Sequence, residues 1–146
     1  MKKILWALIA LIFILPLVWY LFSPLFIIIE LDESIPAVDS KSEAVVMLAG
    51  EFAPSAHEVS GKALIIDTPE GKVLRFEDFE TVNGPDLFIY LSSDLNNDDF
   101  VNLGEIKATK GNVNYLLPKD IDLKKYNKVL VWCRAFRVLF SYAELK

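Results

Sequence analysis

The sequence predicts an all-β fold, a β-sandwich or barrel of about eight short antiparallel strands, preceded by one N-terminal transmembrane helix. Three observations lead to this prediction. The chain carries no charge from Ile4 to Ile29. The remainder consists of short runs rich in Val, Ile, Leu, Phe and Tyr, separated by Gly, Pro, Asn and Asp. Those runs do not keep a helical period over three turns.

The uncharged N-terminal segment has the length of a membrane span. A helix rises about 1.5 Å per residue, so roughly 20 residues cross the ~30 Å hydrocarbon core of a bilayer. Lys3 to Ser23 matches that length. Trp6 near one end and Trp19 with Tyr20 near the other stand where aromatic side chains gather at membrane interfaces. We therefore expect residues 1–29 to be a transmembrane anchor.

A cleaved secretory signal is the alternative to an anchor. Its apolar core would run only about 7 to 15 residues and end at a small-x-small site. The nearest candidates for such a site, Ala37 and Ala44, lie in a polar stretch. Lys2 and Lys3 precede the segment and acidic residues follow it, so the positive-inside rule keeps the N-terminus in the cytoplasm. We predict a single-pass protein of the cell membrane with an extracytoplasmic domain.

Residues 30–43 are expected to be a linker to a domain at residues 44–146. The stretch contains Pro36, Asp39 and several serines, and it shows no period. Fully extended, it would reach about 40 Å, enough to lift the domain clear of the lipid headgroups.

Two turn sequences help to place the strands. Thr68-Pro69-Glu70-Gly71 has the residue preferences of a type I turn and should join two strands as a hairpin, and a second turn is expected at Lys110-Gly111-Asn112. The eight expected strands are Ala44–Leu48, Gly61–Asp67, Lys72–Phe76, Asp86–Leu91, Leu103–Ala108, Asn112–Leu117, Lys128–Cys133 and Val138–Leu145.

Composition excludes several classes of function. Fifteen basic and 20 acidic residues give a net charge of −5, which repels nucleic acid, so no nucleic-acid partner is expected. Cys133 is the only cysteine. A disulfide within the chain, a cysteine-rich zinc or iron–sulfur site and a haem c attachment site are therefore excluded, and we expect neither a metal nor a cofactor.

Two polar features suggest a metal site or a catalytic site, but neither matches a known sequence pattern. The loop from Asp94 to Asp99 is rich in oxygen ligands, yet Leu95 takes an early position and no glycine follows where a calcium-binding EF-hand needs one. His57 is the only histidine, and no Gly-x-Ser-x-Gly context accompanies it. No conventional catalytic constellation is visible, and His57 is expected in a surface loop or at an edge.

Cys133 ends a strand that is apolar on both faces. Val129, Val131 and Cys133 share one face of the strand, as expected from its period of two. A cysteine buried there behaves as a small inert hydrophobe. A nearby guanidinium would favour the thiolate and make Cys133 a redox candidate. Alternation directs the next residue, Arg134, to the opposite face, so Arg137 is the candidate stabiliser of the thiolate.

The chain resembles the DM13 domain, an all-β module found on secreted and membrane proteins. The resemblance rests on short fragments that follow one another in the family's order. They are Gly50-Glu51-Phe52, His57, Ser60-Gly61-Lys62-Ala63, Leu74, Phe79, Gly84-Pro85-Asp86-Leu87, Tyr90-Leu91-Ser92, Gly104, Gly111, Tyr115, Leu117-Pro118, Val131-Trp132-Cys133, Phe136, Phe140 and Ala143.

The resemblance implies a β-sandwich or barrel with a role in electron transfer, and it implies Cys133 as the redox-active group. Two hypotheses follow. In the first, an anchored extracytoplasmic domain performs electron transfer or thiol chemistry through Cys133 with an unidentified protein partner. In the second, the domain is a non-catalytic binding or adhesion module of the cell envelope, and Cys133 is a buried structural residue.

Overall fold

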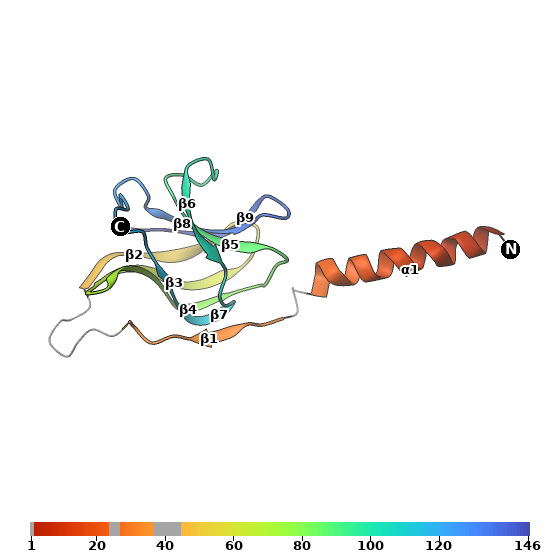
Figure 1. Cartoon of the computed structure of the whole chain (residues 1–146), viewed down its shortest axis with the longest axis horizontal. Helices are drawn as coiled ribbons and strands as arrows, with labels where there is room; N and C mark the ends of the chain where they lie inside the picture. Colours follow the sequence, from red (N-terminus) through yellow and green to blue (C-terminus); the bar gives the residue numbers. More distant parts are fainter. Residues whose placement is uncertain (1, 24–26, 37–44) are drawn as a thin grey trace.

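The computed structural model describes residues 2–23, 27–36 and 45–146. One helix, α1 (Lys2–Phe22), projects from one end of a domain built of strands (Figure 1). The helix is long and apolar enough to cross a membrane, and the rest of the described chain buries none of its most apolar stretch. The predicted combination of one N-terminal helix with an all-β domain is confirmed.

Nine strands form one curled sheet, a half-barrel, in the order β1-β7-β4-β3-β2-β9-β8-β5-β6. The short strand β1 runs parallel to β7, and all other neighbours are antiparallel. The strands are β1 (Glu30–Asp32), β2 (Val45–Pro54), β3 (Val59–Thr68), β4 (Gly71–Thr81), β5 (Leu87–Ser92), β6 (Phe100–Glu105), β7 (Lys110–Leu116), β8 (Lys128–Cys133) and β9 (Val138–Glu144).

Strand β2 connects the two halves of the curl. Its residues from Val45 to Glu51 pair with β3, whereas Phe52 to Pro54 pair with β9. Gly50 lies just before this change of partner, and a Cβ there would collide with the carbonyl of Glu144. The sheet therefore wraps around a single main core, whose fully buried members include Leu74, Ile89 and Val131.

The hairpin between β3 and β4 confirms the first predicted turn. Thr68 pairs with Gly71, and the Thr68 hydroxyl donates a hydrogen bond to the Gly71 carbonyl at 2.7 Å. Strand β5 follows the loop at residues 82–86, and all six of its residues are buried. A strand buried on both faces matches its nearly continuous apolar sequence.

Three local features differ from the prediction. Glu30–Asp32, within the stretch expected to be a linker, forms β1; a three-residue polar edge strand has too few side chains to show a period. Strand β6 begins at Phe100 and ends at Glu105, earlier than expected. The turn predicted at Lys110-Gly111-Asn112 is wrong, because these residues open β7. The start expected for the first domain strand, Ala44, lies outside the described residues.

Candidate functional site

Cys133 lies inside the curl of the sheet. Val129, Val131 and Cys133 belong to the main core, and each is fully buried. Leu130 and Trp132 pack in a second apolar cluster on the outer face. The predicted alternation along β8 is therefore confirmed.

Arg134 is engaged on the outer face, away from Cys133. Its Nη2 and Nε donate to the carboxylate of Asp86 at 3.1 and 3.3 Å. The guanidinium also lies over the ring of Phe88, 3.5 Å from the ring centroid, and Phe88 belongs to the outer cluster. The fixed position of this cation agrees with the expectation that Arg134 does not face the sulfur.

Arg137 ends the turn at residues 134–137, which connects β8 to β9. Its backbone has φ of 54°, a left-handed conformation that non-glycine residues adopt rarely. The side chain is exposed, whereas Cys133 is fully buried. Cys133 pairs with Val138, the residue after Arg137, so the sequence-predicted pair lies at the two ends of one tight connection.

His57 borders an apolar hollow at the end of the domain next to α1. Its ring packs against that of Phe140 at a tilt of 39°, with centroids 4.0 Å apart. The hollow has a volume of about 410 Å³, and its lining is Leu21, Phe22, His57, Pro85, Phe136, Val138 and Phe140. The expected surface-loop position of His57 holds in part, since the side chain is half-buried.

The acidic loop after β5 is organised by contacts within the protein. Asp99 accepts hydrogen bonds from the Tyr126 hydroxyl at 2.9 Å and forms an ion pair with Lys125 at 2.7 Å. Lys125 and Tyr126 lower the pKa of Asp99. Asp94 accepts a hydrogen bond from the backbone N–H of Asn96. Among the described residues, no three His, Cys, Asp or Glu side chains are grouped to hold a metal ion.

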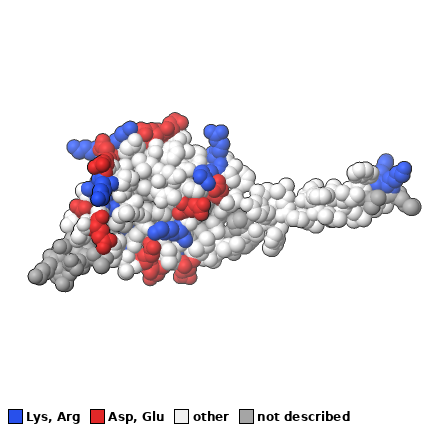
Figure 2. All heavy atoms as spheres, viewed as in Figure 1, with Lys and Arg blue, Asp and Glu red and all other residues white. Residues whose placement is uncertain are grey.

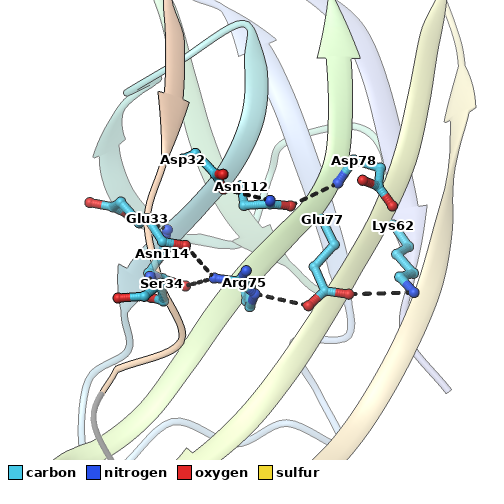
Figure 3. Close-up of polar contacts among 9 residues, drawn as sticks. All are labelled: Asp32, Glu33, Ser34, Lys62, Arg75, Glu77, Asp78, Asn112 and Asn114. Carbon is cyan, nitrogen blue, oxygen red and sulfur yellow. Dashed lines mark hydrogen bonds and ion pairs between the residues drawn. The ribbon is translucent and has the colours of Figure 1, made fainter.

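Sequence reasoning missed a polar cluster around Arg75, on the outer side of β4 (Figure 3). Arg75 is only 6% exposed. Its Nε donates to Glu77 at 2.9 Å, and its Nη1 donates both to the Asn114 side chain and to the Glu33 carbonyl at 3.0 Å. Lys62 pairs with the other oxygen of Glu77 at 3.4 Å. Arg75 therefore connects three strands to the segment that follows β1.

The same cluster attaches the segment after the helix to the domain. The backbone N–H of Asn114 donates to the Glu33 carboxylate at 2.6 Å, and the Asn114 side chain donates to the Ser34 carbonyl at 2.9 Å. Asn112 donates to Asp32 at 2.6 Å and accepts from the backbone N–H of Asp78 (Figure 3). These bonds add to the pairing of β1 with β7.

The attachment begins even closer to the helix. The Asn83 side chain donates to the Ile27 carbonyl at 3.3 Å. The Ile29 N–H donates to the Thr109 hydroxyl at 2.9 Å, and the backbone N–H groups of Thr109 and Lys110 donate to the Ile29 carbonyl. We call residues 27–34 the docked segment.

Charges and burial shift two pKa values in this region. The hydrogen bond from Arg75 lowers the pKa of Glu77 against the opposing effect of burial. Burial raises the pKa of Tyr115 to about 12, although its oxygen accepts a hydrogen bond from the N–H of Lys107.

One signal in the sequence could have revealed the cluster. Arg75 interrupts the apolar run Val73-Leu74-Arg75-Phe76, and a charge in a buried strand requires partners. The identity of those partners could not be predicted, because Glu33 and Asn114 are 42 and 39 residues away.

Comparison with known proteins identifies one family. Residues 51–145 match the family described as Electron transfer DM13, a range that begins within β2 and ends just after β9. The match includes Cys133, Arg137 and His57. No curated protein and no solved structure matches the chain.

Proposed function

The chain belongs to the electron transfer DM13 family, and we propose that it is a single-pass membrane protein whose β-domain serves electron transfer at the extracytoplasmic surface. The observation that carries the anchorage is an apolar helix of 21 residues, whose most apolar stretch nothing in the described chain covers. In a bilayer its apolar side chains meet hydrocarbon, and its backbone bonds are satisfied within the helix. Basic side chains stand at the far end of α1 (Figure 2), where the sequence has Lys2 and Lys3, and the positive-inside rule supports a cytoplasmic position for that end.

Extraction of membranes tests the anchorage. After an alkaline wash, which releases peripheral proteins, we expect the chain to stay in the membrane pellet with the mass of 16.5 kDa that includes α1. A soluble product whose N-terminus lies after residue 29 would identify the helix as a cleaved signal and contradict the proposal.

In the first candidate mechanism, Cys133 is the redox group and Arg137 favours its thiolate. A single thiol has no second cysteine in the chain to form a disulfide. Its two-electron chemistry is therefore exchange with a partner. The Cys133 thiolate attacks a partner disulfide, that S–S bond breaks, a mixed disulfide forms, and one partner sulfur leaves as thiolate. This step requires the sulfur to become accessible.

A second candidate is favoured by the complete burial of Cys133 in the core. Here Cys133 is a structural residue, and the domain acts by binding a partner protein in the cell envelope. Because exchange needs direct contact between sulfur atoms, burial makes this the better-supported role for Cys133 itself.

Thiol alkylation of the folded, full-length chain separates the two candidates. From the burial of Cys133 we expect no reaction with a small alkylating reagent until denaturant unfolds the domain. Reaction in the folded state with an apparent pKa below the ordinary ~8.5, raised by Arg137→Ala, would establish the redox candidate instead. Arg134→Ala is the matched control, since Asp86 and Phe88 hold that guanidinium on the outer face.

A further inference from the structure

The docked segment leaves very little chain between the helix and the domain. Helix α1 ends at Phe22, and the first bond from the docked segment to the domain is made by Ile27. Four residues separate them in the sequence, and even a fully extended chain covers only about 3.5 Å per residue. Asn83, which binds Ile27, therefore lies within roughly 20 Å of the end of the helix.

The end of the domain that faces the helix exposes apolar side chains. Ile28 is 72% exposed, Phe136 56% and Val82 37%. They come from the docked segment, the turn between β8 and β9, and the loop between β4 and β5. Both connections point toward α1 in Figure 1, and the turn between β3 and β4 lies at the opposite end. We call Ile28, Val82 and Phe136 the proximal face.

Two hollows continue this apolar surface on both sides of the loop at residues 82–86. One is the hollow beside His57, where Pro85 and Phe136 meet Leu21 and Phe22 of the helix. The other, of about 450 Å³, is lined by residues that include Ile28 and Val82. On the side shown in Figure 2, charged side chains stand on the domain near α1, and white surface lies between them and the helix.

We propose that the proximal face lies against the phospholipid bilayer, with Ile28, Val82 and Phe136 inserted at the level of the headgroups. The inference rests on the proposed anchorage, since it is α1 that brings this end of the domain to the membrane. The short connection between α1 and the docked segment brings the proximal face to the bilayer. A helix that crosses the ~30 Å hydrocarbon core ends at the headgroup boundary, so the docked segment lies beside that boundary.

Charges around the proximal face indicate which lipids suffice. Arg137 follows Phe136 in the turn, is exposed and suits the phosphate groups that all phospholipids carry, whereas Asp86 holds Arg134. Glu58 and Glu80 line the hollow beside Ile28, and anionic headgroups would be repelled there. We therefore expect the proximal face to insert into bilayers of zwitterionic phosphatidylcholine, with apolar contacts as the main source of binding.

Nitroxide labels on the full-length chain in phosphatidylcholine vesicles test the proposal. The label is attached to Val82→Cys or Phe136→Cys on the proximal face, to Glu70→Cys at the far end, or to Ile12→Cys in the middle of α1. The accessibility of each label is then measured from its relaxation by two reagents: oxygen, which concentrates in lipid, and a nickel chelate, which stays in water. The wild-type chain gives the background labelling of Cys133. Because Cys133 is buried in the folded domain, a variant that takes up one label per chain is folded.

We expect oxygen to dominate at positions 12, 82 and 136 and the nickel chelate to dominate at position 70. Adding Phe136→Asp to the Val82→Cys variant should make its label more accessible to nickel. If position 12 is in lipid while 82 and 136 are as accessible to nickel as 70, the proximal face is wrong and the anchorage stands. If position 12 itself is accessible to nickel, the anchorage fails and the proximal face fails with it.

Discussion

At the scale of single residues, burial decides what each reactive or charged group can do. The interior position of Cys133 was predictable, because strand alternation with Val129 and Val131 depends only on neighbouring residues. The setting of Arg75 was not, since its partners come from distant parts of the chain. A local pattern can show that a side chain is buried, but it does not show which distant groups form hydrogen bonds with that side chain.

Replacing Arg75 should destabilise the domain. Arg75→Met keeps most of the apolar stem but leaves Glu77, Asn114 and the Glu33 carbonyl without their shared donor. Unsatisfied, partly buried groups cost about 1–3 kcal/mol, and we expect a fall of that size in the free energy of unfolding, measured by denaturant titration. Lys62→Met is the control. It removes an exposed pair with the same Glu77 and should cost under about 1 kcal/mol.

The raised pKa of Tyr115 leads us to expect that the domain loses stability at alkaline pH. Its pKa in the folded chain is about 12, above the ordinary value of 10. Between these pH values the unfolded chain has released the proton and the folded chain retains it, so raising the pH favours unfolding. We expect the free energy of unfolding to fall by about 1 kcal/mol per pH unit in this window from Tyr115 alone.

Comparison with Tyr115→Phe isolates that contribution. The variant lacks the ionisable hydroxyl and should show a shallower fall between pH 10 and 12, although it also loses the bond from the Lys107 N–H. An identical slope in both proteins would show that Tyr115 ionises as easily in the folded chain as in the unfolded one.

At the scale of elements, β1 shows that the stretch after α1, expected to be a free linker, is in part bound to the domain. Most strands were predictable from short apolar runs and turn residues. β1 was not, because its identity depends on pairing with β7, 80 residues away. The same pairing explains why the turn predicted at Lys110-Gly111-Asn112 is wrong. Gly111 opens a strand, where a Cβ would collide with the Leu31 carbonyl.

Gly111→Ala should therefore release β1. The substitution places a methyl group against the β1 backbone and also strains a residue with φ of 112°. Gly104→Ala is a matched control: φ there is 107°, but a Cβ would meet no atom within 4 Å. Both variants carry backbone strain, and only the first disturbs β1.

Hydrogen exchange measures the difference. The Glu33 amide donates to the Asn112 carbonyl at 2.8 Å and reports on docking. We expect its protection to fall sharply in Gly111→Ala and to stay near the wild-type value in Gly104→Ala. Equal protection in the two variants would mean that β1 does not depend on close approach to Gly111.

At the scale of the whole molecule, the sequence predicted an apolar helix followed by an all-β domain, and both are present. Charge, hydropathy and turn residues are properties of nearby positions, which is why these features could be predicted. The docking of the segment between them could not, because it depends on long-range hydrogen bonds: Ile27 and Glu33 accept from Asn83 and Asn114, and Ile29 donates to Thr109. Because residues 30–34 are bound along β7, they do not form an extended spacer between α1 and the domain.

The most direct test of the anchored, outward-facing domain is labelling of intact cells with a maleimide that cannot cross membranes. Glu70→Cys places an exposed thiol in the turn at the end of the domain opposite α1, and Lys3→Cys places one at the start of α1. Wild-type chain corrects for Cys133. We predict labelling of position 70 in intact cells and of position 3 only after permeabilisation. Labelling of position 70 only after permeabilisation would contradict the account.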